Sequence, residues 1–273
     1  MNSTQRRRAA SSAMATLLQH ASVAAATVRT EPRNTSSGLI YFEPRVPPIF
    51  CPHFTSDEAG MLLPRFLPPL QDRTHLATLL QSEELTRGVE IGVRRGDFAV
   101  HNLRVWKKCT YYLLVDVWAH QASYVDGANV NDDEQESLFQ TVRHNTKPFA
   151  DKVHFCRNFS LACASVIPNL SLDFVYVDAR HDYKGCLEDL KAYWPKLRNG
   201  GIMAGHDYIY ASEHPGFATG HSDYSVNYDG TRDPLQRAVK GAVDDFFTMC
   251  VPRQVVVTYR DRNAPWVTWM VRK

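Results

Sequence analysis

The sequence has no pair of cysteines at the spacing of a zinc site. Its six cysteines are scattered along the chain without any C-x-x-C pair, at Cys51, Cys109, Cys156, Cys163, Cys186 and Cys250. A metal site built on closely spaced thiolates is therefore disfavoured. Because Cys163 lies in the apolar run LACASVI, we expect it to act as a small core residue with a free thiol. Free thiols in turn indicate a reducing compartment.

The sequence also lacks a long hydrophobic run and a strong excess of charge. The apolar run at 21–28 is too short and too rich in alanine to span a bilayer, so no membrane span is expected. The formal net charge of +2 over 273 residues gives no general attraction for nucleic acid. With 44% hydrophobic residues, the chain can bury a sizeable core, as one large domain or as one domain with an extension.

Acidic residues are absent from the first 30 positions. Arg6, Arg7 and Arg8 form a basic cluster there, and Ser, Thr and Ala are abundant. This composition is typical of a transit peptide and predicts location in a mitochondrion or a plastid. The alternative is a disordered basic tail of a cytoplasmic protein. Either interpretation sets residues 1–35 apart from the rest of the chain.

Residues 36–70 are rich in proline and show no periodicity, which predicts an irregular arm. The arm also contains four phenylalanines, Phe42, Phe50, Phe54 and Phe66, and a disordered linker rarely contains so many. We therefore expect part of the arm to pack on the domain or on a second subunit of a homodimer.

Residues 71–273 show the regular pattern of a single α/β domain. Short runs rich in branched or aromatic residues predict strands at 88–91, 111–117, 152–155, 172–177, 201–204, 254–259 and 266–271. Helices are predicted at 72–82, 97–106, 132–144, 159–166, 183–197 and 234–250. This alternation predicts a doubly wound, Rossmann-like sheet of seven strands, mainly parallel and covered on both faces. The short connection RDRNAP allows only an antiparallel pair, so the sheet should end in a C-terminal antiparallel hairpin.

The turn GVEIGVRRGDFA, residues 88–99, joins the first strand to a helix. Gly92 allows a tight turn, and Gly96 leaves room where a ligand or a strand passes close to the backbone. The dinucleotide fingerprint needs a third glycine, and only two are present here. A ligand without a pyrophosphate fits this turn better, and an NAD-dependent enzyme is disfavoured.

The order of elements and the block VDARHDYKGCLEDLKAYWPKLRNGGIMAGHDY, residues 177–208, carry a family resemblance. Residues 70–273 resemble the class I S-adenosylmethionine-dependent methyltransferases, whose sheet ends in a reversed final strand. The block itself is similar to small bacterial-type methyltransferases related to macrolide-sugar O-methyltransferases. The resemblance implies S-adenosylmethionine as cofactor and a small molecule as substrate.

The cofactor carries an ammonium, a carboxylate and a ribose, and each of these groups needs a partner. Glu90 can accept from the ammonium, and Asp116, at the end of the second strand, can hold both ribose hydroxyls. Trp118 is expected to flank the adenosine or the substrate, with core packing as the alternative. The expected cofactor-binding residues are Glu90, Gly92, Gly96, Asp116, Trp118, Asn158, Ser160 and Asp178.

Methyl transfer to a hydroxyl requires the removal of a proton at or before attack. Asp178 ends the fourth strand, His181 follows it, and His206 and Asp207 end the fifth strand. The carboxyl ends of these strands should meet in one crevice.

Three interpretations of this group remain open. In the first, Asp178, His206 and Asp207 bind a divalent cation, Mg²⁺ or Mn²⁺, and the resemblance supports acidic ligands at these positions. His206 weakens a Mg²⁺ site, because Mg²⁺ prefers oxygen ligands. In the second, no metal binds, and His181 or His206 is the general base, oriented by Asp178 or Asp207. In the third, the D-x-x-H pattern is only a structural cap.

The leading prediction is a metal-assisted O-methyltransferase. The alternatives are a metal-independent N-methyltransferase and a cofactor-binding protein without catalytic activity. The loop from Asp207 to Asp233, which contains several tyrosines, is expected to cover the substrate.

Overall fold

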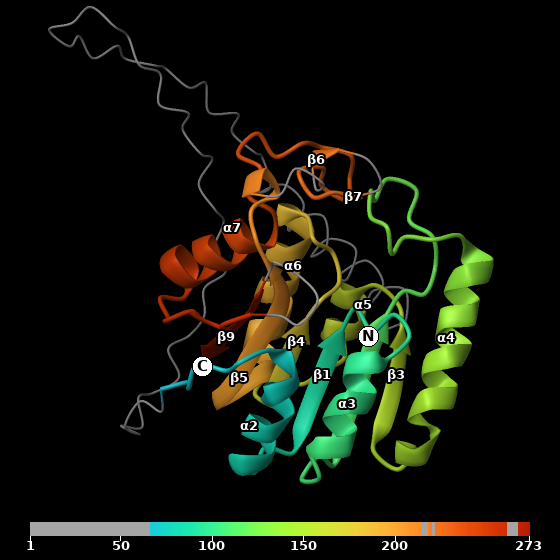
Figure 1. Ribbon diagram of the computed structural model, residues 1–273, viewed down its shortest axis with the longest axis vertical. Coiled ribbons are helices and arrows are strands. Elements are labelled where there is room, and N and C mark those ends of the chain that lie inside the picture. Colours follow the sequence, from blue (N-terminus) through green and yellow to red (C-terminus); the bar gives the residue numbers. More distant parts are fainter. Residues whose placement is uncertain (1–65, 214–217, 220–221, 261–266) are drawn as a thin grey trace, which may run out of the picture. The chain divides into compact units, whose positions relative to one another are not determined.

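A computed structural model describes residues 66–213, 218–219, 222–260 and 267–273 (Figure 1). The segment predicted as a transit peptide and the arm up to residue 65 lie outside the described residues. Within the described part of the chain, no helix is both long and apolar enough to cross a membrane.

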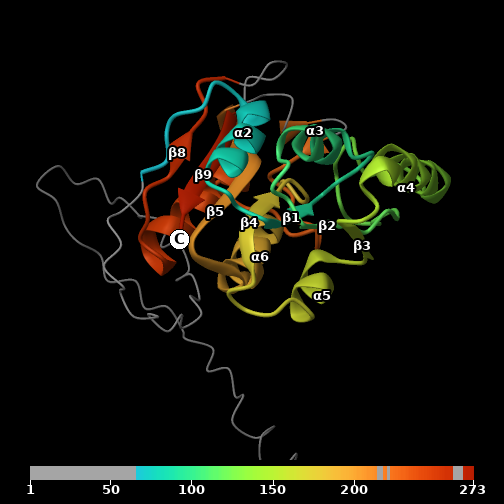
Figure 2. The ribbon, with the colours of Figure 1, turned by 90° about the horizontal axis from the view of Figure 1, so that it is seen from below.

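A sheet of seven strands forms the centre of the fold, in the order β3-β2-β1-β4-β5-β9-β8 (Figures 1 and 2). Its strands are β1 (Arg87–Ile91), β2 (Tyr111–Asp116), β3 (Val153–Arg157), β4 (Leu172–Val177), β5 (Leu197–Tyr208), β8 (Val256–Val257) and β9 (Val267–Arg272). The first five are parallel, and β9 runs antiparallel to both β5 and β8. A small separate pair, β6 (Ala218–Thr219) and β7 (Ser222–Asp223), belongs to the loop after β5. The predicted fold class is confirmed.

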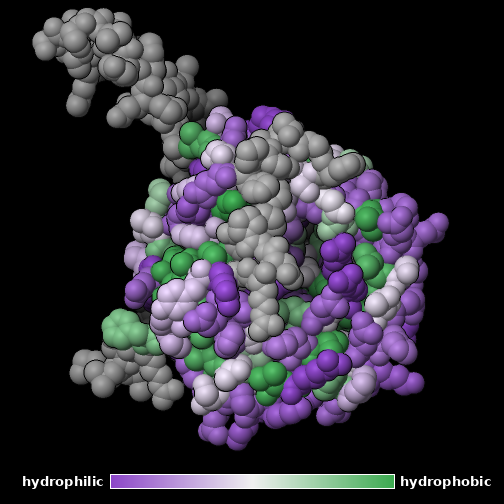
Figure 3. Space-filling view, in the orientation of Figure 1, coloured by the Kyte–Doolittle hydropathy of each residue, from purple (hydrophilic) through white to green (hydrophobic). Residues whose placement is uncertain are grey.

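Helices cover both faces of this sheet, because its central strands are apolar on both sides; all six residues of β4 are buried. Figure 2 shows α2 (Leu76–Ser82), α3 (Asp97–Val105) and α4 (Asp132–Thr146) on one face and α5 (Ser160–Ser165) and α6 (Tyr183–Tyr193) on the other. Two apolar cores follow from this arrangement. Leu80, Leu103 and Val142 belong to the first core, and Cys163 and Leu187 belong to the second. The outer surface of α4 is hydrophilic (Figure 3).

The C-terminal third departs from the predicted boundaries. β5 extends four residues beyond both predicted ends, because Leu197 at one end still pairs with β4 and Tyr208 at the other end pairs with β9. The helix predicted from residue 234 begins only at α7 (Ala238–Asp245) and continues as a π-helical turn, Phe246–Cys250. Gln236 has a left-handed backbone with φ of 51°, so a right-handed helix that began at residue 234 could not continue through it.

The cysteines correct the expectation of free thiols. Cys156 on β3 and Cys163 on α5 form a disulfide, since the short turn between these elements brings their α carbons within 6.1 Å. Cys250 is also disulfide-bonded. Cys109 and Cys186 are free and buried. Cys163 therefore packs in the core as predicted, but it does so as half of a disulfide.

Candidate active site

A cavity of about 420 Å³ lies at the carboxyl ends of the parallel strands. This volume falls within the usual range for small-molecule sites. Most of the predicted residues line it, namely Glu90, Gly92, Asp116, Asn158, Ser160, Asp178, His181, His206 and Asp207. Gly96 and Trp118 do not.

Gly92 makes the tight turn after β1. Its φ is +85°, and a β carbon there would lie 1.9 Å from the carbonyl oxygen of Asp178. Its N–H donates to the carbonyl of Val115 at 2.9 Å. Only glycine fits between these two neighbouring strands, so the turn brings bare backbone to the cavity.

Gly96 has a different role from the one predicted. It precedes α3 with φ of +82°, and a β carbon there would lie 2.5 Å from Cγ2 of Val142 on α4. The close neighbour is thus a packed helix, and Gly96 allows α3 and α4 to approach each other.

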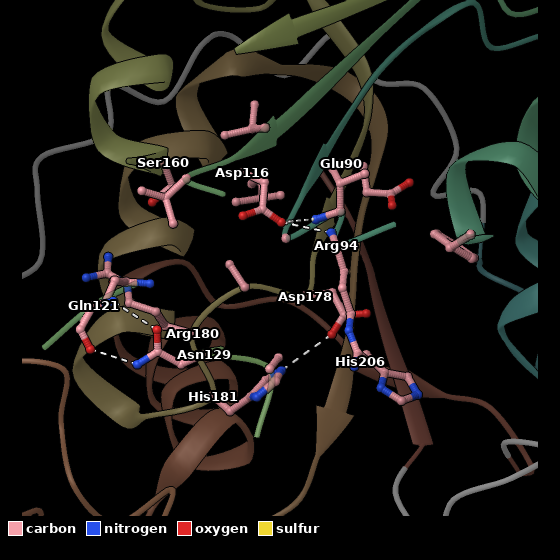
Figure 4. Close-up of a pocket in the computed structure, with 18 of the residues that line it drawn as sticks. Glu90, Arg94, Asp116, Gln121, Asn129, Ser160, Asp178, Arg180, His181 and His206 are labelled. Carbon is pink, nitrogen blue, oxygen red and sulfur yellow. Dashed lines mark hydrogen bonds and ion pairs between the residues drawn. The ribbon is translucent and has the colours of Figure 1, made fainter. Parts of the chain in front are cut away.

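Asp116 joins the glycine turn to the end of β2 through hydrogen bonds. Its Oδ2 accepts the N–H groups of Val93 at 2.9 Å and Arg94 at 2.8 Å (Figure 4). Its Oδ1 accepts the N–H of Trp118 at 3.1 Å. Burial raises the pKa of this carboxyl, although these hydrogen bonds act to lower it. The same carboxylate also lines the cavity.

Trp118 packs in the core. Its side chain is buried, its Nε1 donates to the carbonyl of Arg94 at 2.8 Å, and its ring centroid lies 4.7 Å from that of Phe139. The predicted contact with cofactor is therefore corrected in favour of the alternative, packing. A left-handed backbone with φ of 40° turns this side chain away from the cavity.

Glu90 is buried at the base of the cavity. The hydroxyl of Tyr112 donates to its Oε2 at 2.7 Å. Burial raises the pKa of Glu90 to about 8, and the nearby Asp178 adds to this effect. The carboxyl is thus mostly protonated at neutral pH until a cation approaches it.

Two residues after β3 border the other end of the cavity. Asn158 accepts the N–H of Phe159 at 2.8 Å, and the hydroxyl of Ser160 donates to Asp189. Sequence reasoning missed Phe159, whose half-exposed ring also lines the cavity and offers an aromatic surface.

Asp178, His181 and Asp207 meet in the same cavity, and Figure 4 shows Asp178 and His181 facing each other. The Nε2 atom of His181 lies 3.0 Å from Oδ2 of Asp207 and 3.5 Å from Oδ1 of Asp178. One potential ligand atom from each residue lies within 4.8 Å of the others. The group fits the chemistry of a divalent cation site with two carboxylates and one imidazole.

A β-bulge places Asp207 in this group. The pairing of β5 with β9 shifts register between Gly205 and Tyr208, and Asp207 has a left-handed backbone with φ of 51°. Bulges re-aim side chains in this way next to functional sites. Burial alone would raise the pKa of Asp207, but its electrostatic attraction and hydrogen bonds to His181 and His206 lower this pKa, and the carboxylate stays ionised.

His206 lines the cavity but stands outside this group of three. Its Nδ1 lies 3.2 Å from Oδ1 of Asp207, and in Figure 4 its ring extends away from the pair formed by Asp178 and His181. The predicted ligand set of Asp178, His206 and Asp207 thus changes in one member, with His181 in the place of His206. Neighbouring residues of a strand point in different directions, so the ring of His206 points away from the group of three although its Nδ1 contacts Asp207.

Two further residues contact this group, and no sequence pattern predicted either of them. Asp126 holds Nδ1 of His181 at 2.9 Å, and Arg73 lies 3.3 Å from Asp178 across the cavity. Burial alone would lower the pKa of His181, but Tyr224, Tyr124, Asp207 and Asp126 together hold it well above its usual value.

Residues 89–208, from β1 to the end of β5, match a family model described as a methyltransferase domain. No curated protein matches the sequence.

Three solved structures are similar to this chain. A cofactor-bound protein from MTB is 16% identical, with a TM-score of 0.51, over 77% of this chain and 82% of the other. A protein from Corynebacterium glutamicum is 16% identical, with a TM-score of 0.50, over 74% and 79%. An O-methyltransferase from Bacillus cereus in complex with SAH is 16% identical, with a TM-score of 0.49, over 74% and 80%. At this identity, the likeness concerns the fold.

Proposed function

We propose that this chain, which carries a class I S-adenosylmethionine-dependent methyltransferase domain, moves the methyl group to a hydroxyl oxygen of a small molecule with the help of a divalent cation. The observation that carries the proposal is the group of Asp178, His181 and Asp207 in the wall of the cavity. A hydroxyl must lose its proton to attack the methyl carbon, and charged groups in this position can assist that loss.

The glycine turn supplies the cofactor side of the proposal. The turn at Gly92 receives the methionine part, where no side chain blocks the backbone. Glu90 accepts from the ammonium, and Asp116, which lines the cavity beside the turn, accepts from the ribose hydroxyls. Phe159 and Asn158 border the adenine. This order follows the cavity from the end of β1 to the end of β3.

The group of three fits a divalent cation by its own chemistry. The Nε2 atom of His181 is buried and faces two carboxylates, at 3.0 Å from Asp207 and 3.5 Å from Asp178. Its Nδ1 is held by a carboxylate, as is usual for metal-binding histidines. Asp178, His181 and Asp207 would hold the ion, and the nitrogen ligand favours Mn²⁺ over Mg²⁺. A bound ion would lower the pKa of the substrate hydroxyl.

The charge of His181 argues against its use as the base. Its pKa lies well above the usual value, so the ring of the metal-free protein carries a proton at neutral pH and cannot take another. We assign the base to His206 instead, the second imidazole that lines the cavity.

Calorimetric titration of the full chain with S-adenosylhomocysteine, with and without Mn²⁺ or Mg²⁺, tests the cofactor and the metal together. We expect cofactor binding in all cases and tighter metal binding for Mn²⁺. Absence of cofactor binding under every condition would refute the proposed function.

The substitution Asp207→Ala separates chemistry from cofactor binding. Because Asp207 contacts both histidines, we expect the variant to lose turnover while its affinity for S-adenosylhomocysteine stays within about tenfold, a change of about 1.4 kcal/mol. The matched control is Asp151→Ala, an exposed aspartate in the turn before β3, which should keep full activity. A fully active Asp207→Ala enzyme would remove this residue from the reaction.

A further inference from the structure

We propose that Asp126 is a positioning residue that fixes the ring of His181, so that Nε2 is presented to Asp178 and Asp207. The inference rests on the proposed function, because it concerns the same group of three residues. Asp126 belongs to the connection between β2 and α4, residues 117–131, which we call the β2–α4 loop. Asp126 and His181 are 55 residues apart in the sequence.

The two nitrogens of His181 face different carboxylates. Nδ1 lies 2.9 Å from Oδ2 of Asp126, whereas Nε2 lies 3.0 Å from Asp207 and 3.5 Å from Asp178. The side chain of Asp126 is only 5% exposed, so water competes little for this contact. A hydrogen on Nδ1, shared with Asp126, leaves the Nε2 lone pair for a ligand between the other two carboxylates.

A second residue of the loop holds the backbone beneath this ring. The hydroxyl of Tyr124 accepts the N–H of His181 at 3.0 Å and donates to the carbonyl of Ala179 at 3.4 Å. Backbone and ring of His181 are therefore both held by the β2–α4 loop. The contact with Asp126 orients the ring, and the contact with Tyr124 fixes the backbone that carries it.

The β2–α4 loop is itself held in one conformation. The N–H of Ala128 donates to Oδ1 of Asp126 at 2.7 Å, so the second oxygen of this carboxylate is also fixed. The amide of Asn129 donates to the carbonyls of Gln121 and Tyr124, both at 2.7 Å (Figure 4). Asp126 is therefore held in place before it contacts His181. A residue that orients another side chain must itself be fixed in this way.

The loop after β5 adds a further connection. The N–H of Asp223 donates to the carbonyl of Val125 at 3.0 Å, and the N–H of Gly127 donates to Oγ of Ser222 at 3.1 Å. The residues on both sides of Asp126 are therefore joined to β7. The loop after β5, which we expect to cover the substrate, is thus hydrogen-bonded to the loop that carries Asp126, the carboxylate that orients His181.

The substitution Asp126→Asn, made in the full chain, tests the inference through metal affinity. The carboxylate behind a metal-binding histidine usually contributes about 10- to 100-fold to metal affinity. We therefore expect Mn²⁺ to bind about 10- to 100-fold more weakly by calorimetry, with little change in the affinity for S-adenosylhomocysteine. The matched control is Asp132→Asn at the first residue of α4, where Oδ1 accepts the N–H of His120 at 2.7 Å. It should leave the Mn²⁺ affinity unchanged.

A second measurement reports the ring of His181 without any metal. In ¹⁵N-labelled protein we expect a slowly exchanging, downfield-shifted proton on Nδ1, assigned by its loss in His181→Gln. Asp126→Asn should move or abolish this signal, whereas Tyr124→Phe and Asp132→Asn should retain it. An unchanged signal together with an unchanged Mn²⁺ affinity in Asp126→Asn would overturn the inference. Wild-type protein that binds no divalent cation would instead contradict the proposed function, and the proton signal would still decide the role of Asp126.

Discussion

At the scale of the residue, Glu90 carries a charge that depends on what occupies the cavity. Its pKa is raised to about 8 by burial, and the ammonium of a cofactor would stabilise the ionised form. Cofactor binding must therefore remove a proton from Glu90 at pH 7. Between pH 7 and 8.5 the ionised fraction rises roughly eightfold, and we expect the affinity for S-adenosylhomocysteine to rise in proportion.

Calorimetry over this pH range, in buffers of different ionisation enthalpy, measures both the affinity and the released proton. Two controls isolate Glu90. Glu90→Gln should bind with an affinity that no longer follows pH, and 5′-methylthioadenosine, which lacks the ammonium, should not gain affinity as pH rises. A flat profile for the wild type would contradict the assignment of the ammonium to Glu90.

At the scale of the element, the turn from β3 into α5 is closed by the disulfide between Cys156 and Cys163. Asn158, Phe159 and Ser160 lie inside the closed segment and line the cavity. Reduction of the disulfide frees one end of this segment, while the hydroxyl of Tyr193 still holds the carbonyl of Ser160 at 2.8 Å. We therefore expect only a modest loss, with S-adenosylhomocysteine binding about two- to fivefold more weakly after reduction, within about 1 kcal/mol.

The measurement is calorimetry with and without dithiothreitol. A variant with both Cys156→Ser and Cys163→Ser controls for the other disulfide cysteine, Cys250, and should bind like the reduced wild type under both conditions. An effect of dithiothreitol that persists in the double variant would place the sensitivity elsewhere in the chain.

The sequence predicted those elements best whose apolar pattern is set by their own residues. β4 was predicted with its observed limits, and β2 within one residue, because each consists mostly of branched and aromatic residues. The ends of β5 are polar or glycine-rich and become strand only through pairing with β4 and β9, which no local pattern reveals.

The candidate site divides in the same way. Asp116, Asp178 and Asp207 could be predicted because they stand at strand ends, where parallel strands place their side chains together. Asp126 could not, since it lies in a loop of irregular backbone and reaches His181 only through the fold. Trp118 was assigned to the cofactor because the sequence does not reveal a left-handed backbone.

At the scale of the whole molecule, a buried carboxylate between two helices ties stability to pH. Asp189 on α6 is fully buried, accepts the hydroxyl of Ser160 on α5, and has Arg180 at 3.9 Å. Burial raises its pKa to about 6. The folded protein thus holds this proton more tightly than the unfolded chain does. The resulting stabilisation is complete below about pH 4 and is lost as pH rises through 6.

Replacement by asparagine removes this dependence, because an amide is uncharged at every pH and its oxygen can still accept from Ser160. We expect Asp189→Asn to gain stability over the wild type between pH 4 and 8, by roughly 2 to 3 kcal/mol. Denaturant unfolding of both proteins at pH 4 and at pH 8 measures the difference in their free energies of unfolding. The titration of all other groups is common to both proteins and cancels in this difference. The exposed substitution Asp151→Asn should show no such trend. A difference between wild type and Asp189→Asn that stays constant with pH would mean that Asp189 remains charged in the folded protein, stabilised by Arg180.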